Sequence, residues 1–131
     1  MGRRPRTGNH ITFAGLKNLY GDDVKRAALA CLKSNAELLR DEMKKRAPVG
    51  DPATDKHSGQ LKNSIRIESE SGGKKMLVGT DVGYSRLTEF DPRQLERHPA
   101  WAYPSMDALK KQMIENMRDA IRKAVLKNGG G

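Results

Sequence analysis

The sequence is short of the residues on which many catalytic and binding sites depend. Its one cysteine, Cys31, excludes an intrachain disulfide. The three histidines, His10, His57 and His98, are far apart, and none has a partner at metal-ligand spacing. No glycine-rich loop is followed by Lys and Ser or Thr, the pattern that binds a phosphate. We therefore expect neither a metal nor a cofactor.

Long apolar runs are missing as well. A helix that crosses a bilayer needs about 20 consecutive apolar residues, and no run approaches that length. The first residues are basic, with Arg3, Arg4 and Arg6, but lack the apolar stretch of a signal peptide. The sequence thus predicts no membrane contact and a cytoplasmic location by default.

Size and composition predict one domain with a lean core. The chain has 131 residues, of which 36% are hydrophobic and 31% charged. Two domains of half this length would have too little apolar surface to bury. We expect a disordered basic tail over 1–9, a single domain over 10–127, and a disordered glycine tail over 128–131.

The excess of positive charge, formally +9, lies outside the middle of the chain. Residues 106–131 hold six basic against three acidic side chains, whereas 48–105 hold eight of each. This positive charge would favour contact with nucleic acid or with an acidic protein surface, and a solvated surface explains it equally well. Aromatic residues make up only 5%, so a nucleic-acid contact would be electrostatic and non-specific.

Apolar periodicity predicts two long helices. The first starts at Asp22 or Asp23, which can cap it, and ends before Pro48 after about 24 residues. Cys31 lies on its apolar side, as a buried hydrophobe or, alternatively, a reactive thiol. The second opens at Pro104 and Ser105. Its apolar stripe includes three methionines that suit either the core or a protein interface, Met106, Met113 and Met117.

Alternating segments between the helices predict an antiparallel sheet. Residues 64–69 alternate, a Ser-Gly-Gly-Lys turn follows, and 75–80 form the return strand. We expect a third strand over 84–90, a short strand over 10–13, and irregular chain over 91–103. The predicted class is α+β, an antiparallel sheet of three to four strands covered by the N-terminal and C-terminal helices.

No catalytic constellation stands out. Asp55, His57 and Ser58 are too close on one loop to hold a triad geometry. His98 as a base and Glu89 as an acid have no partner at a fixed spacing. We expect no enzymatic activity.

The order of several motifs resembles the tail-completion family of long-tailed bacteriophages, also called head–tail joining or minor tail components. The motifs are Gly15-Leu16-x-x-Leu19, the long basic helix, Ala47-Pro48-Val49, Ser58-Gly59-x-Leu61-x-x-Ser64-Ile65, the glycine-turn hairpin, Tyr84 through Glu89-Phe90, His98-Pro99-Ala100, and Pro104 before the last helix. The chain departs from the family pattern in a longer loop over 50–57, in Asp91 after the Glu-Phe pair, and in Trp101 and Tyr103.

This resemblance implies a structural virion protein. The implied subunit forms a ring, typically six-fold, at the head-proximal end of the tail, joins the head connector and the tail tube, and surrounds the passing DNA. Its location would be the virion, after assembly in the host cytoplasm. The alternative is a small basic module that binds nucleic acid non-specifically.

Two segments are the candidates for contact with partners. One is the mobile loop, with Gly50, Asp51, Pro52, Asp55, Lys56 and His57. The other is a docking segment, with Glu89, Phe90, His98, Pro99, Trp101 and Tyr103.

Overall fold

A computed structural model of the chain describes residues 5–12, 21–50, 53, 58–83, 85–96 and 99–127. The elements follow in the order β1 (Thr7–Thr12), α1 (Asp22–Arg46), α2 (Gln60–Ser64), β2 (Arg66–Glu70), the 3-10 turn η2 (Ser71–Gly73), β3 (Lys75–Thr80), α3 (Ser85–Phe90), α4 (Pro92–Leu95) and α5 (Ala102–Lys127). None of the helices in these ranges combines the length and hydropathy needed to cross a bilayer.

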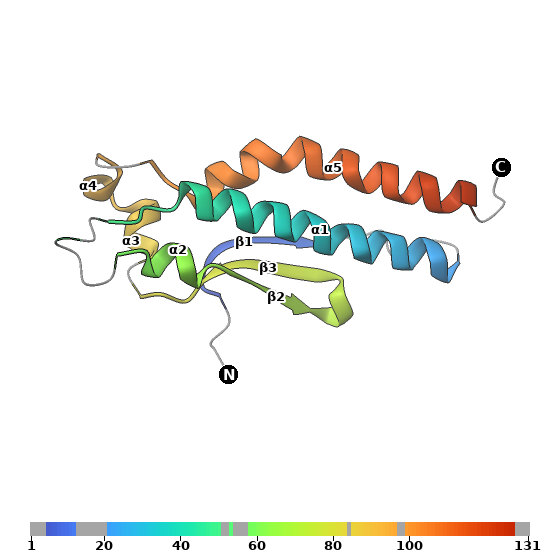
Figure 1. The fold of residues 1–131 in the computed structure, drawn as a ribbon, viewed down its shortest axis with the longest axis horizontal. Helices are drawn as coiled ribbons and strands as arrows, with labels where there is room; N and C mark the ends of the chain where they lie inside the picture. The colour runs from blue at the N-terminus through green and yellow to red at the C-terminus, as the bar shows by residue number, and fades with distance from the viewer. Residues whose placement is uncertain are drawn as a thin grey trace.

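Two layers make up the fold. The sheet is antiparallel with strand order β1-β3-β2, and α1 and α5 pack side by side on one of its faces (Figure 1). α1 packs on all three strands, whereas α5 packs on α1 and β1. This arrangement confirms the predicted α+β class, with a sheet covered by the N-terminal and C-terminal helices.

The apolar side of α1 forms much of the core, as its periodicity predicts. The helix begins after Gly21, at φ 81°, so Asp22 and Asp23 lie in its first turn instead of capping it. Its seven buried residues include the polar Asn35. The core cluster consists of Leu32, Ala36, Leu39, Met43, Ala47, Leu61, Ile65, Met76, Val78, Trp101, Ala102 and Met113.

The central hairpin is confirmed, with shifted boundaries. β2 starts at Arg66, because Gln60–Ser64 form the short helix α2. This helix follows Gly59, which adopts φ 79° at its N-cap. Glu70 pairs with Lys75 across the turn, and Ile67 pairs with Val78. Both apolar side chains face the helices, as the alternation predicts.

One prediction for the sheet is wrong. The predicted third strand over 84–90 is instead the helix α3 over Ser85–Phe90, with Tyr84 outside the described residues, and the predicted short N-terminal strand, β1, completes the sheet. Ser85, Thr88 and Glu89 are buried at helical spacing. A helix that buries polar side chains has no apolar periodicity to reveal it.

The N-terminal and linking segments also differ from prediction. β1 begins at Thr7 instead of His10, so three residues assigned to the disordered tail pair with β3. In the segment predicted to be irregular, Pro92–Leu95 form α4, where the Asp91 carboxylate accepts a hydrogen bond from the Arg93 N–H at 2.9 Å. Residues 5 and 6 are also described, and the Arg6 N–H donates to the Thr80 carbonyl at 2.9 Å. Residues 1–4 and 128–131 of the tails, residue 13 of the predicted short strand, and most of the loop over 50–57 lie outside the described residues.

A pair of facing glycines lets β1 approach β3. Gly8, at φ 150°, pairs with Gly79. A Cβ on Gly79 would overlap the carbonyl of Thr7, and one on Gly8 would overlap the carbonyl of Val78. Because these obstacles are backbone atoms, no side-chain rotation can relieve the overlap.

We expect Gly79→Ala to destabilise the protein by about 3 kcal/mol, because the added methyl group forces β1 away from β3. Urea denaturation of the purified chain measures the loss. Gly83→Ala is the matched control, since a Cβ there meets nothing within 4 Å, and it should change stability by less than about 0.5 kcal/mol. Equal stability of the two variants would contradict this account of the strand pairing.

Candidate functional site

Glu89, predicted to belong to the docking segment, holds the first turn of α5 in place. Its side chain is 3% exposed. Oε1 accepts hydrogen bonds from the N–H groups of Trp101 at 2.7 Å and Ala102 at 2.9 Å, and Oε2 accepts one from Tyr103 at 2.8 Å. These donors have no partner within the helix, and a carboxylate is favoured at the positive end of the helix dipole.

Trp101, the second buried member of the docking segment, extends this contact into a polar network. Its indole Nε1–H donates to Thr88 Oγ1 at 2.9 Å, and Thr88 Oγ1 donates to the Ser85 carbonyl at 2.7 Å. Ser85 Oγ donates to Thr7 Oγ1 at 2.8 Å. The network therefore joins the start of α5, the helix α3 and the strand β1.

The remaining described members of the docking segment reach the surface. Phe90 and Tyr103 are 49% and 53% exposed, and their rings lie 5.6 Å apart at 53°. Pro99 is exposed nearby in sequence, and His98 lies outside the described residues. A contact with a partner at this end of the molecule would therefore use Phe90, Pro99 and Tyr103, while Glu89 and Trp101 support them from within.

The mobile-loop candidates are described only at one edge. Gly50 is exposed at φ 82°, and its carbonyl accepts a hydrogen bond from Ser58 Oγ at 3.4 Å. The Gly59 N–H donates to the Val49 carbonyl at 2.8 Å, which closes the base of the loop. Asp51, Pro52, Asp55, Lys56 and His57 lie outside the described residues.

Among the residues that the structure describes, two ionisable groups have clearly shifted pKa values, and neither marks a reactive centre. Burial raises the pKa of the Cys31 thiol, which favours the protonated, unreactive form. The pKa of Arg66 is also raised, first by its hydrogen bond to Glu68 and further by Asp81. Arg66 Nη1 lies 3.2 Å from Asp81 Oδ1, so the residue links the start of β2 to the end of β3. Among the described residues, no group of three side chains could hold a metal ion.

α5 meets α1 through polar contacts that sequence reasoning missed. Asn35 Nδ2 donates to the Met113 carbonyl at 3.0 Å, and Asn35 Oδ1 accepts from Asn116 Nδ2 at 3.1 Å. A similar contact joins α5 to β1, where Asn9 Nδ2 donates to the Ala102 carbonyl at 2.8 Å. In the sequence, the only indication of these contacts is the polar Asn35 among apolar residues on the buried side of α1. The three methionines of α5 differ in burial. Met113 is buried in the core, whereas Met106 and Met117 are partly buried against it.

The fold defines a small α+β protein with several large apolar side chains exposed at its surface. A family model described as "Bacteriophage HK97-gp10, putative tail-component" matches residues 14–90, more than half of the chain. The chain belongs to this family, which confirms the resemblance to phage tail components that its motifs indicate. It is therefore a tail-associated structural component of a phage virion. Comparisons with curated proteins and with solved structures give no match.

We expect Glu89→Ala to reduce the free energy of unfolding by about 2–3 kcal/mol, because three N–H groups at a buried helix start lose their acceptor. Glu89→Gln, which keeps one acceptor oxygen, should lose less. Glu96→Ala removes an exposed glutamate and should change stability by under about 0.5 kcal/mol. Chemical denaturation compares all three, and a Glu89→Ala variant as stable as Glu96→Ala would exclude this capping role.

Proposed function

We propose that this protein completes the phage tail. In this proposal its subunits form a ring, with six-fold symmetry, at the head-proximal end of the tail, and the ring joins the head connector to the tail tube. The observation that carries the proposal is the family match over residues 14–90. The role is structural, without catalysis, and assembly takes place in the host cytoplasm.

The distribution of exposed apolar side chains supports a ring. A closed ring needs two unlike surfaces on each subunit, so that one surface of a copy meets the other surface of its neighbour. Phe90 and Tyr103 are exposed near the start of α5, and Val125 and Leu126 are exposed near its end. α5 runs from beside the end of the molecule that carries α3 and α4 to the opposite end, so its two ends are far apart (Figure 1).

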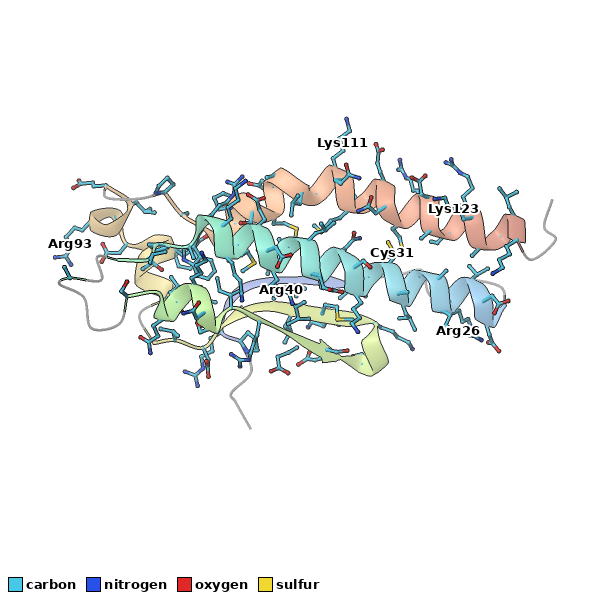
Figure 2. All side chains as sticks on the ribbon, viewed as in Figure 1. Arg26, Cys31, Arg40, Arg93, Lys111 and Lys123 are labelled. Carbon is cyan, nitrogen blue, oxygen red and sulfur yellow. The ribbon has the colours of Figure 1, made fainter. Side chains whose placement is uncertain are left out.

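DNA passage through the ring is the second part of the proposal. A lumen that DNA crosses must not repel phosphate, and the chain has a formal charge of +9. Figure 2 shows Lys111 on the outer side of α5, away from α1. Basic side chains of this kind would reduce the electrostatic cost of threading DNA without reading its sequence.

A phage that lacks this protein should produce DNA-filled heads and separate tails, because the joining ring is missing. Negative-stain electron microscopy of the lysate gives the fraction of joined particles, and supplying the protein in trans should restore them. Normally joined particles in its absence would refute the proposed function.

Tyr103→Ser should lower the yield of joined particles at least about tenfold if the Phe90–Tyr103 pair contacts a partner, a loss of roughly 1.4 kcal/mol of contact energy. Leu38→Ser is the control, since Leu38 is 43% exposed on α1 and belongs to neither of the two proposed ring surfaces. Both changes are at the surface and should leave thermal unfolding nearly unchanged. If Tyr103→Ser phage give the same yield of joined particles as the wild type, the Phe90–Tyr103 pair does not contact a partner.

A further inference from the structure

The layer of helices is wider than the sheet that it covers. Two packed helices, each about 10 Å across, span about 20 Å, whereas three strands at a spacing of about 4.8 Å span about 14 Å. β1 is the strand nearest to α5 and β2 is the farthest (Figure 1). α5 therefore reaches past the outer edge of β1 by roughly the width of one strand.

A groove of about 380 Å³ occupies this place. It lies between β1, which contributes Ile11 and Thr12, and the near side of α5, with Leu32 of α1 in its lining. The side chains that α5 contributes are mostly apolar, namely Met106, Met113, Ile114, Met117 and Ile121. Only three residues of α5 are buried over its 26 positions, against seven over the 25 of α1. The subunit thus leaves much of the apolar stripe of α5 without a full cover.

The charge of the groove has one sign. Its charged lining residues, as far as the structure describes them, are Lys110 and Arg118, which lie one turn before and one turn after Ile114. Neither makes an ion pair with any other described residue. A segment that brings carboxylates beside its apolar side chains would therefore complement the groove.

The last two residues of β1, Ile11 and Thr12, border the groove, and the outer edge of this strand can receive a further strand. One edge of β1 pairs with β3, and no strand pairs with the other within the described part of the chain. Natural sheets protect such edges with Pro, Lys or inward-pointing charges. The sequence of β1, Thr-Gly-Asn-His-Ile-Thr, contains none of these. Unprotected edges of this kind are used for strand addition by partner peptides.

We propose that β1 accepts a fourth strand from a different virion protein. The added segment is extended, with apolar side chains at alternate positions that fill the groove under α5 and carboxylates at its flanks that meet Lys110 and Arg118. The Arg-rich first residues of a second copy are poor donors, because the same two cations would repel them. The inference depends on one part of the proposed function, namely that the protein is a component of the virion.

Photo-crosslinking in assembled virions tests the proposal. Ile114 is replaced by p-benzoylphenylalanine, the purified particles are irradiated, and mass spectrometry maps the crosslinked peptide. We expect one segment of another virion protein, with alternating apolar residues and flanking acids. The matched control is Leu38 on α1, which is also apolar and is 43% exposed, compared with 46% for Ile114. The same photo-reactive residue at position 38 should not capture that segment. Ile121 provides a second groove position in case one substitution impairs folding.

Crosslinks confined to the same chain, to a second copy, or to a basic or helical segment would overturn the proposal. So would an absence of crosslinks in particles that contain the substituted protein. Normal joining in the deletion phage refutes the proposed function instead, so the two failures are distinguishable.

Charge reversal gives an independent readout. Lys110→Glu combined with Arg118→Glu should reduce the crosslink yield from position 114 at least about tenfold. The control pair, Arg122→Glu with Lys123→Glu, reverses two cations of the same helix that do not line the groove, and its yield should stay within about twofold. Equal losses in the two pairs would show that net charge alone matters and would contradict the proposed contact.

Discussion

The buried carboxylate of Glu89 is the contact on which the rest of the structure depends. A charged group with 3% exposure is costly unless donors surround it, and here the N–H groups of Trp101 and of the first two residues of α5 do so. The positive end of the helix dipole adds to this compensation. Because α5 packs on both α1 and β1, fixing its first turn also fixes how the helical layer lies on the sheet.

Three further hydrogen bonds position α5, besides the packing of Met113 in the core. Asn35 and Asn116 set its register against α1, and Asn9 ties its first turn to β1. Hydrogen bonds of this kind define one arrangement, since each buried amide is satisfied only at one position along the helix. With few of its apolar side chains buried, α5 has apolar surface left for partners in the virion, in keeping with a subunit that works within an assembly.

The family match and the position of Glu89 connect these features to function. The match ends at Phe90, so it includes α3 but not α5. Within the matched region lies the carboxylate that positions α5, whose own surface carries the groove and part of the exposed aromatic pair.

The sequence by itself determined the elements whose buried residues are apolar. The long stripe and Pro48 defined α1, and alternation around Ser71-Gly72-Gly73 defined the hairpin of β2 and β3, because burial of apolar side chains leaves a period of 3.6 or 2 in the sequence. The ordered motifs also indicated the family.

Only the tertiary structure decided the elements whose burial is polar or whose pairing is distant. Thr7 and Gly8 form a strand because Gly79, far along the chain, leaves room for their backbone. Ser85, Thr88 and Glu89 form a helix because their polar atoms find partners on β1 and α5. Glu89 and Trp101, predicted as members of a docking segment, are buried in the fold. A polar residue is buried only where the fold brings it a hydrogen-bond partner, and such partners are not visible in local sequence.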